Sequence, residues 1–141
     1  MQKLDLNKFD GWLGVNKEVG VSSAKVVSMI KKIMNSKKAG HAGTLDPLAC
    51  GVLPIALGEA TKTVKYTMYA KKSYEFDIKW GEATDTEDLE GKIINVSKLR
   101  PSKNDIINAL KCFTGNIKQK PPSFSAIKIG GIRSYKLARN S

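Results

Sequence analysis

The stretch Gly40-His41-Ala42-Gly43-Thr44-Leu45-Asp46-Pro47, followed by Gly51-Val52-Leu53-Pro54, sets one carboxylate in a loop rich in glycine and proline. Pro47 disfavours the helical conformation at Asp46, while Gly40 and Gly43 accept backbone angles that other residues avoid. Such a loop presents a side chain on a stiff backbone and lets a ligand approach closely. We therefore take Asp46 as the candidate nucleophile of a catalytic site.

The composition predicts one globular unit. The chain has 141 residues, of which 41% are hydrophobic and 26% charged, and this balance suits a folded core rather than a disordered chain. No apolar run is long enough to span a membrane, and the first residues lack the apolar core of a signal peptide. We expect a soluble, cytoplasmic protein that makes no membrane contact.

The residues that support metal and hydrolase chemistry are too few to favour either. Cys50 and Cys112 match neither a paired metal motif nor a disulfide framework, and the apolar run around Cys50 indicates a small buried residue. His41 is the single histidine, yet no G-x-S-x-G motif accompanies it. His41 and Asp46 together lack a third metal ligand. We expect no metal site.

The charge points to a polyanionic partner. The sequence has 24 basic and 13 acidic residues, a formal net charge of +11, and a pI near 9.7. Nucleic acid is the leading partner class, although lysine is also a common solubilising surface residue. Because nearly all the excess is lysine rather than arginine, phosphate contact is better supported than base reading.

Apolar periodicity predicts alternating strands and helices. The clearest strand is 74–80, where Tyr74, Phe76, Ile78 and Trp80 alternate with polar residues. Residues 35–47 lack periodicity and are predicted to be a surface loop, with Lys37 and Lys38 at the mouth of the glycine-rich motif. The other predicted elements are strands at 12–15, 52–57, 92–96 and 124–129, and helices at 24–34, at 60–68 and from Pro101-Ser102 to near Gly115.

Three blocks of sequence resemble the TruB family of tRNA pseudouridine synthases. The first is the glycine-rich motif continued through Gly58-Glu59-Ala60-Thr61-Lys62, the second is Lys72-Ser73-Tyr74 with Gly81, Thr84, Thr86, Asp88 and Gly91, and the third is Pro121-Pro122-Ser123-Phe124-Ser125-Ala126-Ile127-Lys128 with Gly131, Arg133, Tyr135 and Ala138-Arg139. The resemblance implies an α+β fold, with a mixed, mainly antiparallel sheet and flanking helices. It identifies residues 1–141 as the N-terminal portion of the catalytic domain.

By this resemblance the chain isomerises uridine-55 in the T loop of tRNA to pseudouridine, and it uses no cofactor. Asp46 matches the family's catalytic aspartate, and an aspartate that is ionised near neutral pH suits attack at the sugar or assistance to elimination. Tyr74 matches the active-site tyrosine, whose ring can stack on an extruded uracil. His41 matches a histidine that helps to displace the base. Tyr74 as a core residue and His41 as a loop brace remain the alternatives.

The partner implied by the resemblance is the T-arm stem-loop of tRNA. The candidate RNA-binding side chains, besides His41, are Lys37, Lys38, Lys62, Lys128 and Arg133. Lys17 matches the family's first motif, but Glu18 replaces the usual proline after it, so we interpret Lys17 as structural. Arg139 falls in the third block, where a phosphate contact and a structural role are both open.

Family members continue beyond the length of this chain. They have a further motif, whose arginine pairs with the aspartate, and then an RNA-binding tail domain, and neither is present in these 141 residues. We expect an exposed sheet edge and hence self-association or weak stability. Two functions remain open: an active synthase, and a catalytically silent RNA-binding fragment of one. A metal-dependent hydrolase is a distant third.

Overall fold

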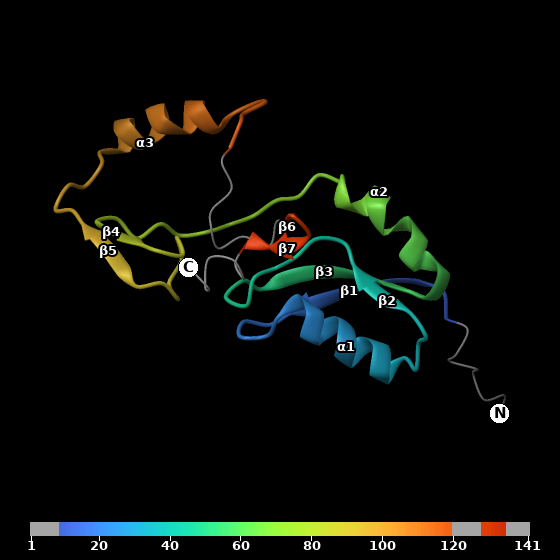
Figure 1. Ribbon diagram of the computed structural model, residues 1–141. Coiled ribbons are helices and arrows are strands. Elements are labelled where there is room, and N and C mark those ends of the chain that lie inside the picture. The colour runs from blue at the N-terminus through green and yellow to red at the C-terminus, as the bar shows by residue number, and fades with distance from the viewer. Residues whose placement is uncertain (1–8, 120–127, 135–141) are drawn as a thin grey trace. The chain divides into compact units, whose positions relative to one another are not determined.

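The computed structural model describes residues 9–119 and 128–134 (Figure 1). Where the composition predicts one globular unit, the chain divides into two compact units, Met1–Tyr74 and Glu75–Ser141. Within the described residues, no helix is long and apolar enough to cross a membrane.

The first unit is built on a three-stranded antiparallel sheet (Figure 1). Its strands are β1 (Gly11–Lys17), β2 (Ala39–His41) and β3 (Gly51–Leu57), in the order β1-β3-β2. The β1 to β3 pairing places Lys17 opposite Gly51 at one end and Gly11 opposite Leu57 at the other. The predicted strands at 12–15 and 52–57 are therefore confirmed, whereas β2 lies inside the segment predicted as loop.

The core lies between β3 and the helix α1 (Ser23–Ile33). Every second residue of a strand faces the same side, so Leu53, Ile55 and Leu57 form one apolar row, which is buried together with Val26 of α1. Leu13, Val15, Ile30 and Leu45 are among the partly buried side chains that pack against this row. This burial is the main source of stability in the unit.

Helix α1 has a serine cap at its N-terminus and basic residues in its last turn. Ser22 is the N-cap, and its side chain accepts a hydrogen bond of 3.2 Å from the backbone N–H of Lys25. Lys31 and Lys32 lie in the last turn, where cations interact favourably with the helix dipole. The helix differs from the predicted range of 24–34 by one residue at each end.

A glycine turn connects β3 to η2 (Gly58–Thr63) and α2 (Val64–Met68). Gly58 has φ of +57°, and a Cβ there would collide with Asp10 and approach the Phe9 carbonyl to 3.0 Å. Asp10 also accepts a hydrogen bond of 2.6 Å from the Glu59 N–H. The helix predicted at 60–68 is thus confirmed as two short consecutive turns of helix.

Pro54 lies in the central strand, where a proline is uncommon. Its carbonyl accepts a 3.0 Å hydrogen bond from the Ala42 N–H, just after β2 ends. In an antiparallel ladder such a residue pair would exchange a second hydrogen bond, but proline has no N–H to donate. The β2 to β3 ladder therefore stops at Pro54, and the chain leaves the sheet as the loop that carries Asp46.

The second unit contains two hairpins and one longer helix. The strands β4 (Glu82–Thr84) and β5 (Ile93–Val96) pair, as do β6 (Lys128–Ile129) and β7 (Ile132–Arg133). The helix α3 (Lys103–Leu110) begins with a capping box between Ser102 and Asp105 and continues into η3 (Lys111–Phe113). The helix predicted from Pro101-Ser102 and the return strand at 92–96 are confirmed, while residues 124–127 of the last predicted strand lie outside the described residues.

The strand predicted at 74–80 is wrong. Residues 71–79 have no regular secondary structure, and Tyr74 and Phe76 are 67% and 75% exposed. Alternation of apolar and polar residues indicates a strand only where a neighbouring strand completes the ladder and a second layer covers the apolar face. In the described residues neither is present beside this segment, and the hairpin strand is β4 instead.

Candidate functional site

Asp46 lies in the loop between β2 and β3, residues 42–50, here called the Asp46 loop. Its first residue, Ala42, is buried, and the backbone of Ala42 is tied to the sheet by the hydrogen bond to Pro54. Gly43 follows with φ of +96°, a conformation that L side chains rarely adopt. Asp46 itself is exposed, so the loop presents its carboxylate to solvent.

Ser23, the first residue of α1, holds the loop just before Asp46. Its Oγ donates a 2.8 Å hydrogen bond to the carbonyl of Leu45 and accepts a 3.0 Å hydrogen bond from the Leu45 N–H. One hydroxyl thus satisfies both backbone groups of one residue. Ser23 is only 2% exposed, so water does not compete for these bonds.

Lys17, the last residue of β1, holds the loop just after Asp46. Its side chain is fully buried, and Nζ donates to the carbonyls of Glu18, Val21 and Pro47 at 2.9, 2.8 and 3.4 Å. These three acceptors match the three donors of an ammonium group. The Pro47 carbonyl also accepts a 2.7 Å hydrogen bond from the Gly20 N–H. The interpretation of Lys17 as structural agrees with this position.

The backbone of Asp46 is therefore fixed on both sides. Leu45 is held by Ser23, Pro47 is held by Lys17 and Gly20, and the Asp46 carbonyl accepts a 3.0 Å hydrogen bond from the Ala49 N–H. Such a backbone fixes the direction of the bond from Cα to Cβ of Asp46, so little further chain entropy is lost there when a ligand binds. This is the arrangement that a nucleophile or an electrostatic partner of a sugar carbon needs.

His41 lies at the end of β2, at the entrance to the loop. Its Nδ1 makes a short contact with the Gly43 carbonyl. Because a carbonyl can only accept, Nδ1 is the donor in this contact. The ring orientation is thus set by the loop, which agrees with the loop-brace alternative and leaves the RNA contact a prediction.

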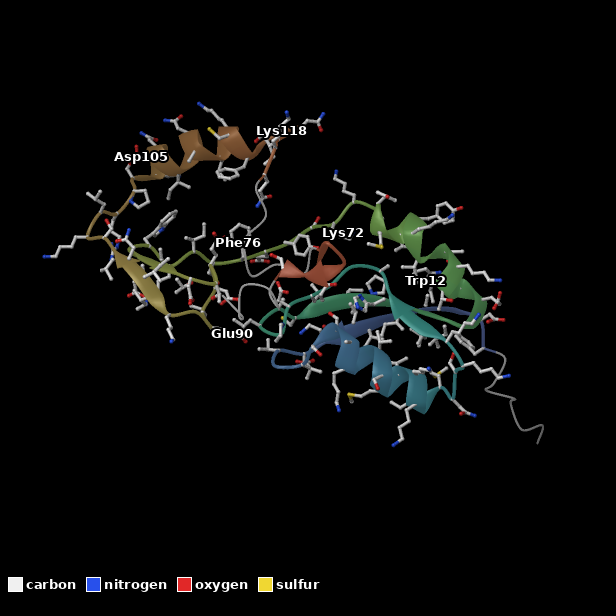
Figure 2. The ribbon with its side chains drawn as sticks, in the orientation of Figure 1. Trp12, Lys72, Phe76, Glu90, Asp105 and Lys118 are labelled. Carbon is white, nitrogen blue, oxygen red and sulfur yellow. The ribbon has the colours of Figure 1, made fainter. Side chains whose placement is uncertain are left out.

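Tyr74 lies two residues after Lys72, whose side chain contacts the Asp46 loop. A methyl group added at Gly43 would lie 3.5 Å from Cε of Lys72, so the Lys72 side chain (Figure 2) lies beside the Asp46 loop. The Lys72 Nζ donates to the Met68 and Ala70 carbonyls at 2.7 and 3.1 Å. Tyr74 itself is exposed rather than packed in the core. The core alternative for Tyr74 is therefore wrong, while its role toward a base is untested.

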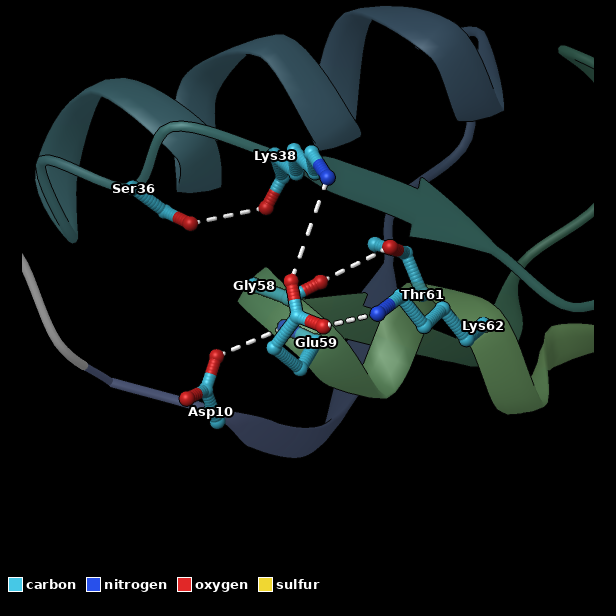
Figure 3. Close-up of polar contacts among 7 residues, drawn as sticks. All are labelled: Asp10, Ser36, Lys38, Gly58, Glu59, Thr61 and Lys62. Atoms are coloured by element: carbon cyan, nitrogen blue, oxygen red, sulfur yellow. Dashed lines mark hydrogen bonds and ion pairs between the residues drawn. The ribbon is translucent and has the colours of Figure 1, made fainter.

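Two of the candidate RNA-binding lysines meet at one glutamate (Figure 3). Lys62 forms an ion pair with Glu59, and the Lys38 Nζ lies 3.9 Å from the Glu59 Oε1. The hydrogen bond and charge of Lys62, with a smaller effect of Lys38, lower the pKa of Glu59 below its ordinary value, and the contact with Glu59 raises the pKa of Lys62. Because these side chains are exposed, the pairs are screened by solvent.

Lys37 and Lys38 were predicted to lie at the mouth of the Asp46 loop, and this placement is wrong for Lys38. The Lys38 carbonyl accepts from the Gly58 N–H, just beyond the Leu57 end of β3, whereas the loop is held by Lys17, which pairs with Gly51 at the other end. Six residue steps of a strand separate these ends by about 20 Å. Lys37 directly precedes Lys38 and is exposed. Any contact of these residues with RNA is remote from Asp46.

The remaining candidates fall in the second unit. Lys128 and Arg133 are backbone partners in the β6 to β7 hairpin, but their side chains lie outside the described residues, as does Arg139.

Cys50 was expected to be buried, and this is wrong: Cys50 and Cys112 are both exposed. Cys50 precedes the first residue of β3, at the surface end of the apolar run. Across residues 9–119 and 128–134, no group of three or more His, Cys, Asp or Glu is placed to hold a metal ion.

Ser23 is the site residue that the sequence analysis missed. Ser22 and Ser23 are adjacent, and either could cap a helix, so the pattern does not say which one caps and which one turns inward. The signal for Ser23 in the sequence is its position in the first turn of the helix, directly after another serine. One hydroxyl is enough to cap the helix, so the second hydroxyl has no capping role.

A family model described as "TruB family pseudouridylate synthase (N terminal domain)" matches residues 31–141. The chain belongs to the TruB family of pseudouridylate synthases. The resemblance drawn from the three sequence blocks is therefore confirmed, and the matched range includes the whole Asp46 loop.

Curated relatives show how much of a TruB-family protein this chain covers. The tRNA pseudouridine synthase B of Ehrlichia chaffeensis is 54% identical over 130 residues, which are 92% of this chain and 44% of that protein. The protein of the same name from Wolbachia pipientis is 57% identical over 131 residues, 93% of this chain and 37% of that protein. The chain thus spans less than half the length of these relatives.

A solved structure supports the same fold. "Crystal Structure of a Cbf5-Nop10-Gar1 Complex" contains a chain that is 35% identical, with a TM-score of 0.53, over 84% of this chain and 31% of that chain. The predicted α+β class with mainly antiparallel strands and flanking helices is confirmed.

Replacing Lys17 tests whether its buried ammonium holds the loop. Lys17→Met keeps much of the apolar stem but leaves buried carbonyls without their donor, so the free energy of unfolding should fall by about 1–3 kcal/mol. Lys25→Met, on the exposed surface of α1, removes the same charge and should change it by less than about 0.5 kcal/mol. Urea unfolding followed by tryptophan fluorescence measures both, and equal effects would contradict the assignment.

Proposed function

We propose that this chain carries the catalytic centre of a tRNA pseudouridine synthase that converts uridine-55 of the T loop to pseudouridine. The observation that carries the proposal is an exposed carboxylate, Asp46, on a backbone held on both sides, inside the motif of a pseudouridylate synthase family. The relatives named above are tRNA pseudouridine synthases, which supports tRNA as the substrate and the cytoplasm, where tRNA is found, as the place of action.

The reaction needs bond exchange without a change of oxidation state. The bond between uracil N1 and the ribose C1′ breaks, a bond between C5 and C1′ forms, C5 loses its proton and N1 gains one. Asp46 acts at the sugar, either by attack on C1′ or by stabilising the positive charge that develops as the base departs. Both routes require the carboxylate to be held in one direction, and the hydrogen bonds to the Leu45 and Pro47 carbonyls contribute to this by fixing the backbone on either side of Asp46.

The target base must leave the folded T loop to reach Asp46. We assign Tyr74 to stacking on the extruded uracil, because its ring is exposed and its segment lies beside the Asp46 loop through Lys72. We assign His41 to the position in the RNA stack that the base vacates. The contact of Nδ1 with Gly43 orients the ring.

The distribution of charge supports RNA as the partner. The unit Met1–Tyr74 has 12 basic and 5 acidic residues, whereas Glu75–Ser141 has 12 basic and 8 acidic residues. Most of the net positive charge thus belongs to the unit that contains Asp46. We propose that Lys37, Lys38 and Lys62 contact phosphates of the T arm away from the reacting base, with Lys128 and Arg133 as further phosphate contacts.

A catalytically silent RNA-binding fragment is the second candidate, and one observation favours it. Among the ion pairs within residues 9–119 and 128–134, none involves Asp46. A cation beside a carboxylate stabilises its ionised form and fixes its direction, and the resemblance to the family leads us to expect such an arginine in a later motif. RNA binding is common to both candidates, so only turnover separates them.

Turnover is measured with a T-arm stem-loop that carries tritium at uracil C5. Formation of the new bond at C5 must release this tritium to water. The chain should release tritium, and Asp46→Asn should lower the rate by at least about 1,000-fold, because an amide carries no charge and is a poor nucleophile.

Asp105→Asn is the matched control. It also removes one carboxylate, but in the first turn of α3, where an asparagine oxygen can still accept from the Ser102 N–H, so the rate should be unchanged. No release by the chain despite salt-dependent RNA binding would support the silent fragment instead. Equal release by the chain and by Asp46→Asn would remove Asp46 from the mechanism.

Glu59→Gln tests the RNA contact of Lys38 and Lys62. The substitution removes the carboxylate that both lysines approach, so affinity for the stem-loop should rise about two- to fivefold at low salt. The slope of log affinity against log salt should steepen by about 0.7–0.9 for each lysine that gains a phosphate. Glu18→Gln makes the same charge change away from these lysines, and an identical gain there would contradict the assignment.

We also propose that the chain self-associates through the exposed segment at 74–80. Its apolar side chains alternate and are exposed, and Phe76 (Figure 2) is 75% exposed. A segment without a strand partner can pair with a second copy of the chain. Sedimentation velocity should show a weight-average mass that rises with concentration.

Two neighbouring substitutions separate apolar contact from charge in this self-association. Phe76→Lys and Glu75→Gln each raise the net charge by one, but only the first removes an apolar side chain from the alternating row. Phe76→Lys should give a monomer at every concentration, and Glu75→Gln should behave like the unmodified chain. A monodisperse monomer with a sharp thermal transition for the unmodified chain would refute the proposal.

A further inference from the structure

We propose that Ser23 is a positioning residue for the reaction, which sets the direction of the Asp46 carboxylate through the peptide group between Leu45 and Asp46. This inference rests on the proposed role of Asp46. It goes beyond that role because it concerns a hydroxyl on a different element, 22 residues away in sequence from its partner Leu45. Ser23 makes no contact with the reacting atoms in this proposal.

Two peptide planes meet at the Cα atom of Asp46. The angle φ of Asp46 is defined relative to the peptide plane that contains the Leu45 carbonyl, and ψ relative to the plane that contains the Asp46 carbonyl. The first carbonyl accepts a 2.8 Å hydrogen bond from the Ser23 Oγ, and the second accepts a 3.0 Å hydrogen bond from the Ala49 N–H. With both planes held, the direction of the bond from Cα to Cβ is fixed.

Of these two restraints, the bond to Ala49 is local, because it closes a turn within the loop itself. The bond to Ser23 is the one that ties the Asp46 peptide to the rest of the unit. Ser23 begins α1, and α1 packs against β3 through Val26. The Ser23 hydroxyl therefore fixes the Asp46 loop relative to the apolar core.

Burial makes this restraint strong. Ser23 is 2% exposed, and its hydroxyl both donates to and accepts from Leu45, so its proton has a single defined direction. Leu45 also packs its side chain against the apolar cluster. Without the hydroxyl, two backbone groups of Leu45 lose their partner together, and the peptide preceding Asp46 is free to rotate.

Ser22 provides a matched control for Ser23. The two residues are identical and adjacent, but the Ser22 side chain is the N-cap and accepts from Lys25, whereas Ser23 turns inward to Leu45. Loss of either hydroxyl should lower the thermal stability of the chain. Only the loss of Ser23 should change the peptide before Asp46.

The test compares Ser23→Ala, Ser23→Cys and Ser22→Ala in the 141-residue chain. Tritium release should show a kcat about 10- to 100-fold lower for Ser23→Ala, with KM for the stem-loop unchanged, since misorientation of a reacting group lowers the rate of chemistry rather than binding. Ser23→Cys fills the site with a weak hydrogen-bonding group, and should fold and lose kcat in the same direction. Ser22→Ala should melt at a lower temperature with kcat unchanged.

Hydrogen exchange and NMR supply readouts that do not depend on turnover. The Leu45 amide should exchange about tenfold faster in Ser23→Ala, while amides of β1 and β3 keep their protection and so show that the unit is folded. The Asp46 side chain should occupy one χ1 rotamer in the unmodified chain and several in Ser23→Ala and Ser23→Cys, as measured by coupling constants. Ser22→Ala should match the unmodified chain in both.

These readouts separate the failure of this proposal from that of the proposed function. If the unmodified chain releases no tritium, the proposed activity fails, and the Leu45 exchange and the Asp46 rotamers decide the role of Ser23. If the chain is active but the Ser23 variants keep kcat, or if the Asp46 rotamers are the same in all variants, the positioning role is overturned. Equal loss of kcat in Ser22→Ala and Ser23→Ala would mean a purely structural effect.

Discussion

The burial of one face of β3 against α1 is the constraint from which the site follows. Once Leu53, Ile55 and Leu57 pack against Val26, the N-terminus of α1 is fixed relative to the sheet. The antiparallel register then brings the end of β1 to the beginning of β3. Ser23 and Lys17 are therefore brought to the residues before and after Asp46 by the packing of α1 on β3 and by the pairing of β1 with β3. An exposed carboxylate is positioned by an apolar core.

Most of the first unit could be predicted because its signals are local. The helix α1 has a capping serine and an apolar stripe, and β3 has a continuous apolar run that overcomes its proline. The strand β2 could not be predicted, because it has three residues, includes a glycine, and exists only through its ladder with β3. The prediction of a strand at 74–80 is wrong for the opposite reason. The alternation of apolar and polar residues is strong there, but alternation shows only that a strand could bury one face, and not that a partner strand is present.

The candidate site was predictable in its chemistry and less so in its geometry. Asp46 followed from a proline, two glycines and a family motif, all adjacent in sequence. The hydrogen bonds that hold it involve Ser23 and Lys17, which lie 22 residues before Leu45 and 30 before Pro47. Likewise, the positive charges of Lys38 and Lys62 are evident in the sequence. That Glu59 lies close to both of them is not, because this depends on the fold of the chain after β3. Long-range hydrogen bonds of this kind leave no periodic trace in a sequence.

The missing N–H of Pro54 also bears on how the protein tolerates changes in chain length. A ladder that could continue past Ala42 would absorb an inserted or deleted residue by slipping, with each strand residue moving to the opposite face. Because the ladder has no donor at Pro54, β2 has one defined end, and the number of residues between Ala42 and Gly51 is fixed by the sheet on one side and by Ser23 and Lys17 on the other. A lengthened loop could not be accommodated by a shift in register, and the extra residue would have to bulge at the carboxylate itself.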